Sequence, residues 1–226
     1  MTHNPSYIKS LREKARLTQQ EVADKLGVSR PTYLQLEAGK TELSLSQAET
    51  LAQLYGLSIE EFSAQSKRLY EKYKEMVLAF LRQAPAVPKT KLAKMLYLSD
   101  FAWFYDHLQS MSGMPYRKIQ YGPVPDAYFR AITELEEAGK INIERTTREG
   151  KEMNLISESA GNKKMVLSHI SKDELALIKK IAIKWKDKRT AEIVDFTHQQ
   201  LPYALCREDE IIPYALITQE DPDNVI

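Results

Sequence analysis

The sequence has little of what secreted and membrane-bound proteins use. Its 226 residues include one cysteine, Cys206, so no disulfide can form within the chain, which is typical of the reducing cytoplasm. The apolar runs are short and interrupted by charged residues, so we expect no segment that spans a bilayer. The first residues have neither the basic start nor the apolar stretch of a signal peptide. The composition therefore predicts a cytoplasmic protein.

An excess of one charge and a cluster of metal ligands are missing as well. The chain has 32 basic and 31 acidic residues, which excludes a uniformly basic coat of the histone kind but not a local basic surface. The four histidines are far apart in sequence, and no Cys/His spacing typical of structural zinc occurs. We therefore expect neither a metal nor another cofactor.

The charge varies along the chain and helps to divide it. Eight basic residues and two acidic ones lie between Lys67 and Lys94, whereas one basic and six acidic residues follow from Arg207 onward. The basic stretch is most simply a solvated face, with contacts to DNA or to an acidic partner as alternatives, and the acidic tail either folds onto a basic surface or stays loose. No long linker is visible, so we expect domains at residues 1–65 and 66–226, joined by a short connection or a continuous helix.

The first 65 residues predict five short helices. Thr18 and Glu21 have the spacing of a capping box at the start of the second helix, and Gly27 ends it. Ser29 caps the third helix, and Pro31 suits its first turn. The inward faces that we expect for the first four helices are formed by Ile8, Leu11 and Ala15; Val22, Ala23 and Leu26; Tyr33 and Leu36; and Leu45, Ala48, Leu51, Ala52 and Tyr55. A fifth helix opens over residues 58–62.

A helix, a three-residue turn with glycine and a second capped helix are typical of a helix-turn-helix. The residues that carry this pattern read LTQQEVADKLGVSRPTYLQLEAGK over positions 17–40. This stretch closely resembles the Xre/Cro/phage-repressor family, and the resemblance covers about residues 6–62. It implies a phage-repressor-like domain that binds operator DNA. We expect it to act as a homodimer or higher homo-oligomer that reads two half-sites about 34 Å apart.

The geometry of such a domain assigns roles to individual residues. Arg30 can donate two hydrogen bonds to guanine, and Thr32 and Gln35 are further candidates for contacting bases or phosphates. Ser29 lies where a helix N-terminus faces phosphate, and Lys40 can neutralise a phosphate. The resemblance implies that Gln19 holds the DNA backbone and that Arg12 and Glu37 form a structural pair. Pro31 replaces a polar base-reading residue of many relatives, which leaves the operator sequence open.

The second half predicts a mostly helical α+β domain with a small antiparallel sheet, so the whole chain is mainly α. Residues 92–105 are apolar on every side, which indicates a central helix contacted from several directions. Short strands are expected over the ranges 141–147, 152–156 and 164–167, with a hairpin turn at 148–151. Asp126 is expected to cap one helix, and a last helix is expected over 191–201.

Two motifs in this half resemble the Panacea domain, the SocA-like or GepA-like family, over about residues 70–203. They read KMLYLSD at positions 94–100 and YGPVP at positions 121–125. The resemblance implies an antitoxin that neutralises a co-encoded protein toxin by direct binding. Fused to an Xre-type domain, such an antitoxin resembles a repressor of its own operon.

Some candidate site residues of this half are expected to have a structural role, and others to contact a partner. We expect Asp100 to accept hydrogen bonds from the loop near Tyr121 and Gly122, which together with Pro123 form a structural motif. The residues that we predict to contact the toxin are Tyr116, Arg117 and Lys118.

A catalytic role is the less favoured interpretation of the ionisable residues. Asp100, His107 and His198 lack a nucleophile with a nearby base, so we expect no catalytic residue and no enzyme. A regulator that senses a small ligand and has no toxin partner is the main alternative, and a hydrolase under autoregulation is the other.

Overall fold

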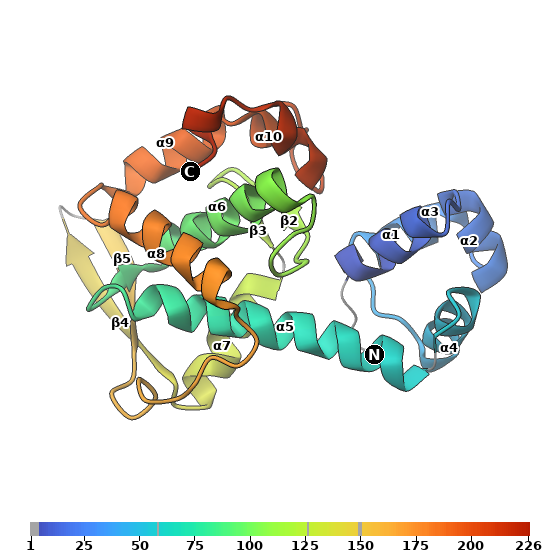
Figure 1. The fold of residues 1–226 in the computed structure, drawn as a ribbon, viewed down its shortest axis with the longest axis horizontal. Coiled ribbons are helices and arrows are strands. Elements are labelled where there is room, and N and C mark those ends of the chain that lie inside the picture. The colour runs from blue at the N-terminus through green and yellow to red at the C-terminus, as the bar shows by residue number, and fades with distance from the viewer. Residues whose placement is uncertain (1–4, 58, 126, 149–150) are drawn as a thin grey trace. The chain divides into compact units, whose positions relative to one another are not determined.

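The fold is known from a computed structural model that describes residues 5–57, 59–125, 127–148 and 151–226 (Figure 1). The chain forms a first unit that ends at Glu71 and includes Gly113–Pro115, and a second unit made of Lys72–Ser112 and Tyr116–Ile226. Both units are mainly helical, and the second contains small antiparallel sheets, which confirms the predicted fold class. Helix α5 (Ile59–Leu81) passes through residues 65 and 66 without a break, so the domain boundary expected there stays a prediction.

The first unit contains α1 (Pro5–Lys14), α2 (Gln19–Leu26), α3 (Arg30–Glu37), α4 (Leu45–Leu54) and the start of α5. Its hydrophobic core is formed by Ile8, Val22, Ala23, Tyr33, Leu36, Leu43, Ala48, Leu51, Ala52 and Phe62. The expected burial of Leu45 is wrong, because Ser44 caps α4 and Leu45 is its first residue, 60% exposed. Leu43 is buried instead, one residue before the cap, and Ala48 is buried in the first turns of the helix, as in a hydrophobic staple.

The second unit is built around α6 (Lys89–His107). This helix contacts α8 (Lys172–Trp185), α9 (Thr190–Gln199) and the 3-10 helix η1 (Tyr214–Gln219), as well as short strands on its other sides. All residues from 91 to 102 are buried, so the prediction of a central helix is confirmed.

The strands of this unit form two antiparallel sheets. β1 (Val87–Pro88), β5 (Lys151–Glu158) and β4 (Ile141–Arg148) lie in that order, and β2 (Tyr116–Arg117) pairs with β3 (Val124–Pro125). Helix α7 (Ala127–Glu137) contacts β4. Arg148 pairs with Lys151 at the end of the expected hairpin, while its turn residues 149–150 and the expected cap Asp126 lie outside the described residues.

The strand expected over 164–167 is wrong. That segment has no strand structure, and Met165 and Val166 are exposed. β4 pairs with β5 along its whole length, and on the other edge of β5 the strand β1 pairs with Leu155 and Ile156. The third strand of the sheet is the two-residue β1, which carries almost no sequence signal.

The last predicted helix is interrupted at Gln200, whose backbone is extended. α9 ends before it, and α10 (Leu201–Ala204) begins after it with Pro202 in its first turn, where a missing backbone N–H is tolerated. The tail then folds back through η1 and η2 (Pro222–Asn224), and the backbone N–H of Ile212 donates to the carbonyl of Tyr116 over 2.8 Å. The tail is therefore packed rather than loose, with its bonds to Arg117 and Lys118 made by backbone carbonyls, while Glu208, Asp209 and Glu210 are exposed.

Within the described ranges, no helix is both long enough and apolar enough to cross a membrane.

Candidate nucleic-acid interface

The start of α2 is fixed by the predicted capping box. The backbone N–H of Glu21 donates to the hydroxyl of Thr18 over 3.2 Å, and the backbone N–H of Thr18 donates to the Glu21 carboxylate over 2.7 Å. These bonds to Thr18 lower the pKa of Glu21, which keeps the carboxylate charged. The negative charge lies in the first turn, where it also complements the helix dipole.

A tight turn joins α2 to α3. Gly27 ends α2 in the left-handed conformation with φ 66°, as its position in the sequence predicted. Ser29 then caps α3, because its hydroxyl accepts a hydrogen bond of 3.2 Å from the backbone N–H of Thr32. The residues from Ser29 to Thr32 are exposed, so the N-terminus of α3 is open to a ligand.

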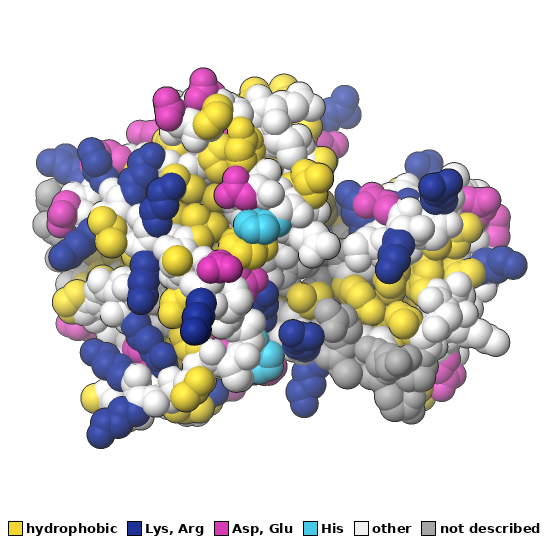
Figure 2. All heavy atoms as spheres, viewed as in Figure 1, with side chains coloured by type: hydrophobic (Ala, Val, Ile, Leu, Met, Phe, Trp, Pro, Cys, Tyr) yellow, Lys and Arg dark blue, Asp and Glu magenta, His cyan; other side chains and the backbone are white. Residues whose placement is uncertain are grey.

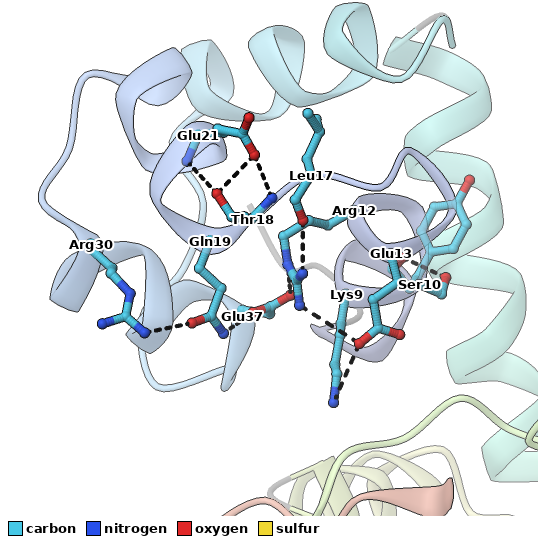
Figure 3. A network of polar contacts seen from close by, with 11 residues as sticks. Lys9, Ser10, Arg12, Glu13, Leu17, Thr18, Gln19, Glu21, Arg30 and Glu37 are labelled. Atoms are coloured by element: carbon cyan, nitrogen blue, oxygen red, sulfur yellow. Dashed lines mark hydrogen bonds and ion pairs between the residues drawn. The ribbon is translucent and has the colours of Figure 1, made fainter.

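A chain of polar contacts runs from α1 to this open end of α3 (Figure 3). Arg12 Nε donates to Glu37 Oε1 over 2.8 Å, and Gln19 Nε2 donates to Glu37 Oε2 over 2.9 Å. The other side of the Gln19 amide, Oε1, accepts a 3.4 Å hydrogen bond from Arg30. The buried Glu37 therefore orients Gln19, and Gln19 in turn holds the exposed guanidinium of Arg30.

Glu37 determines the electrostatics of this chain. Burial of Arg12 opposes its charge, but the hydrogen bond and the negative charge of Glu37 outweigh that effect and raise the pKa of Arg12. Arg12 also donates to the carbonyl of Leu17 over 3.0 Å, which ties the end of α1 to the segment before α2. The pairing of Arg12 with Glu37 that the resemblance implied is present.

The remaining predicted DNA contacts lie along α3 and beyond its end. Thr32 and Gln35 are exposed and three residues apart, so they share one face of the helix. Lys40 is exposed just after α3. Contact of any of these residues with DNA stays a prediction. Leu34 is also exposed, which was not predicted from the sequence. The signal was its position next to Tyr33, because a residue that directly follows an inward-facing one on a helix points to another side.

The second unit has a buried polar centre at Asp100. The Asp100 carboxylate accepts hydrogen bonds from the backbone N–H and the hydroxyl of Ser112, both 2.6 Å, and from the hydroxyl of Tyr116, 2.8 Å. The expected bonds from the loop near Tyr121 and Gly122 are wrong, because Ser112 and Tyr116 occupy the carboxylate. Burial raises the pKa of Asp100 to about 6, although these hydrogen bonds oppose the shift.

Lys94 is the residue that contacts the Gly122 loop, and the sequence analysis did not single it out. Its ammonium group is buried and donates to the carbonyl of Pro123 over 3.0 Å. Burial lowers the pKa of Lys94 to about 7. A lysine in the middle of a helix that is otherwise apolar on every side was the signal that could have identified it.

The three residues predicted to contact a toxin are largely enclosed by the tail. Tyr116 and Arg117 are buried, and the guanidinium of Arg117 donates to the carbonyl of Asp209 over 2.5 Å. Lys118 donates to the carbonyls of Tyr203 and Cys206 over 2.9 and 2.8 Å. Their contact with a toxin stays a prediction. Tyr121, a few residues further on, is 70% exposed.

The residues considered for acid–base chemistry have separate partners. His107 Nδ1 lies 3.0 Å from the carbonyl of Trp103, and the His198 ring stacks on Tyr203. Asp100 is bonded to Ser112 and Tyr116 as described. Among the residues that the structure describes, no three His, Cys, Asp or Glu side chains gather as a metal site would require.

Comparison with known proteins identifies two regions. Residues 8–62 match the model of the helix-turn-helix family, and residues 92–202 match that of the antitoxin SocA-like Panacea domain. Both matches coincide with the resemblances seen in the sequence.

Individual relatives match about a quarter to a third of the chain. The chain is 38% identical over 73 residues to the cryptic phage CTXphi transcriptional repressor RstR of Vibrio cholerae, a match that covers 32% of this chain and 66% of that protein. It is 43% identical over 54 residues to an uncharacterized HTH-type transcriptional regulator of Methanocaldococcus jannaschii, covering 24% of this chain and 82% of the relative. A further uncharacterized HTH-type regulator, from Archaeoglobus fulgidus, is 39% identical over 66 residues, 29% of this chain and 93% of the relative. No solved structure matches the chain significantly.

Proposed function

The chain belongs to the helix-turn-helix family of transcriptional regulators, and on that premise we propose that it is an antitoxin that represses its own operon. The observation that carries the DNA-binding part is the exposed N-terminus of α3, where Gln19 holds Arg30 in place. An arginine oriented before binding loses less conformational freedom when it docks, so the arrangement suits base recognition.

In this proposal the N-terminus of α3 enters the major groove of the operator. Arg30 donates to O6 and N7 of a guanine, while the Ser29 hydroxyl and the backbone N–H of Arg30 face a phosphate. Thr32 and Gln35 contact neighbouring bases or phosphates, and Lys40 neutralises a phosphate beyond the helix. A dimer places two such helices in successive grooves about 34 Å apart.

The antitoxin part of the proposal is supported by the similarity of residues 92–202 to the SocA-like Panacea domain. Neutralisation by binding needs no catalytic group. It needs only a stable interface that covers the surface through which the toxin acts. An interface of ordinary size buries about 1,600 Å² in total, which a unit of this length can provide.

The test is a growth assay with the full chain. The reading frame next to this gene is induced in a host with the wild-type protein, with the Arg30→Ala variant, or with neither. We expect growth arrest that both proteins relieve, while only the wild type represses a reporter driven by the DNA upstream of the gene. Arrest that the wild type does not relieve, or no arrest at all, would contradict the antitoxin role and leave a ligand-sensing regulator.

A further inference from the structure

A rigid loop of the second unit presents an exposed tyrosine. The loop runs from Lys118 to Gly122, and the backbone N–H of Gly122 donates to the carbonyl of Ile119 over 2.7 Å, which closes a tight turn. Gln120 and Tyr121 at its tip are exposed. Tyr121 is 70% exposed, but single exposed apolar side chains are common, and Leu108, Val166 and Ile183 of this unit are also exposed, so the surroundings of Tyr121 decide whether it has a role.

The loop is held from the side by the segment that follows α9. Lys118 Nζ bonds to two carbonyls of residues 203 and 206, and lies 4.4 Å from the ring centroid of Tyr203. The hydroxyl of Tyr203 returns a 3.0 Å hydrogen bond to the carbonyl of Ile119. These contacts join the loop to α10, so the two segments form one fixed surface.

The loop is also held from beneath. Gly122 has φ 92°, and a β-carbon at this position would lie 2.7 Å from Cε of Lys94 and 2.8 Å from Nε2 of His198. Lys94 in turn bonds to the carbonyl of Pro123. The buried Lys94 and the half-buried His198 therefore lie directly against the turn that carries Tyr121 and support it from below.

A second exposed apolar side chain lies on the partner segment. Leu205, directly after α10, is 63% exposed, and after Cys206 and the exposed Arg207 come three exposed acidic residues, Glu208, Asp209 and Glu210. Figure 2 shows hydrophobic side chains on the surface over α9 and α10, with both acidic and basic side chains beside them. We call Tyr121 and Leu205, with this acidic border, the Tyr121 surface.

We propose that the Tyr121 surface is where the second unit docks onto the toxin, and that the toxin meets it with an apolar pocket bordered by basic side chains. This rests on the proposed function. Tyrosine is among the residues that contribute most to binding energy at interfaces, and here its loop is already fixed, so little freedom is lost on binding. The acidic border favours a basic partner and speeds its approach.

This assignment differs from the sequence prediction of Tyr116, Arg117 and Lys118. Tyr116 and Arg117 come directly before the loop and Lys118 begins it, and all three bond to the segment from residue 203 to residue 212, so they position the Tyr121 surface rather than form it. Tyr116 is fully buried, with its ring against those of Phe101 and Tyr214, so a toxin could reach it only if the unit rearranged. Docking on the exposed surface needs no such rearrangement.

The experiment measures binding of the full-length protein to the purified product of the adjacent reading frame by calorimetry. Tyr121→Ala is expected to raise the Kd about 30-fold, and Leu205→Ala about tenfold. Phe129→Ala is the matched control, because Phe129 is also an exposed aromatic residue, 52% exposed, but lies on α7. It should change the Kd less than about twofold.

The acidic border is tested by association rates. Glu208→Gln should slow association about threefold at low salt and have little effect at high salt, where charges are screened. Glu137→Gln, an exposed acidic residue at the end of α7, is the charge-matched control and should leave the rate unchanged.

The outcomes separate the docking surface from the proposed function. If the wild type binds the product and Tyr121→Ala binds equally well, the surface is wrong while the antitoxin role stands. If Tyr121→Ala instead changes the oligomeric state of the protein alone, the surface joins copies of this chain and the proposal is overturned. If the wild type does not bind, both the antitoxin role and the docking of a toxin on this surface are contradicted.

Discussion

Arg12 and Glu37 are joined by a 2.8 Å hydrogen bond that is also an ion pair, and it connects the first helix of the chain to the end of α3. Their side chains are 11% and 5% exposed, so water screens the pair only weakly. Glu37 also accepts a hydrogen bond from Gln19. Removal of the carboxylate would thus leave two donors without their acceptor.

We expect Glu37→Ala to lower the free energy of unfolding by about 2–4 kcal/mol, since an unpaired buried arginine retains its desolvation penalty. Urea denaturation followed by circular dichroism measures the loss. Glu13→Ala is the control, because the exposed Glu13 lies 3.7 Å from the same arginine and should contribute less than about 1 kcal/mol. Equal effects of the two substitutions would contradict the structural role of Glu37.

Arg30 is expected to determine operator specificity. Arg30→Ala should weaken binding to the DNA upstream of the gene by about 1–3 kcal/mol and reduce discrimination against unrelated DNA, because a contact to a guanine edge is lost. Fluorescence anisotropy at fixed salt concentration gives both affinities. Arg130→Ala removes a partly exposed arginine of α7 and should leave specific binding unchanged.

The helix-turn-helix could be predicted from sequence because its signals are local. The Thr18–Glu21 box, the left-handed Gly27 and the Ser29 cap each involve residues within three positions of one another. Such signals depend on backbone geometry that a short stretch of sequence specifies by itself.

The contacts of the second unit were harder to predict from the sequence, because they join residues that are far apart along the chain. Asp100 and Ser112 are 12 positions apart, and Lys118 and Cys206 are 88 apart. The basic stretch was expected to be a solvated face, but some of its residues form ion pairs with acidic residues far along the chain. Lys72 pairs with Glu174, and Arg82 pairs with Glu158. Charge pattern alone does not reveal which bases have partners within the fold.

Asp100 should make stability depend on pH. Its pKa in the folded protein, about 6, lies above that of an exposed aspartate, so the protonated form is favoured by folding. This contribution is fully present below the unfolded pKa of about 4 and is lost as pH rises through about 6. Relative to Asp100→Asn, the wild type should lose on the order of 2–3 kcal/mol between pH 4 and pH 7.5. Denaturation of both proteins across this range measures the difference, and a constant difference would contradict the raised pKa.

Gly122 connects the buried Lys94 to the exposed Tyr121, so its substitution should affect both stability and binding. An alanine there must adopt a left-handed backbone, which costs about 1–2 kcal/mol. Its β-carbon must also displace both Lys94 and His198. Lys94 can move only by weakening its hydrogen bond to Pro123, so we expect a total loss of about 2–4 kcal/mol for Gly122→Ala.

The Gly139→Ala variant separates the two causes of the expected loss of stability, which are backbone strain and the displacement of neighbouring side chains. Gly139 also has a positive φ, 66°, but no atom lies within 4 Å of the position of its β-carbon, so only the backbone strain of about 1–2 kcal/mol should appear. In a Lys94→Ala background only His198 still lies within 3 Å of the new β-carbon, so the additional cost of Gly122→Ala should fall but stay above the Gly139 value. Thermal and urea denaturation of the four variants gives the coupling energy. A coupling near zero would show that Lys94 does not support the turn, and the position of Tyr121 would then depend on the contacts of His198, Lys118 and Tyr203.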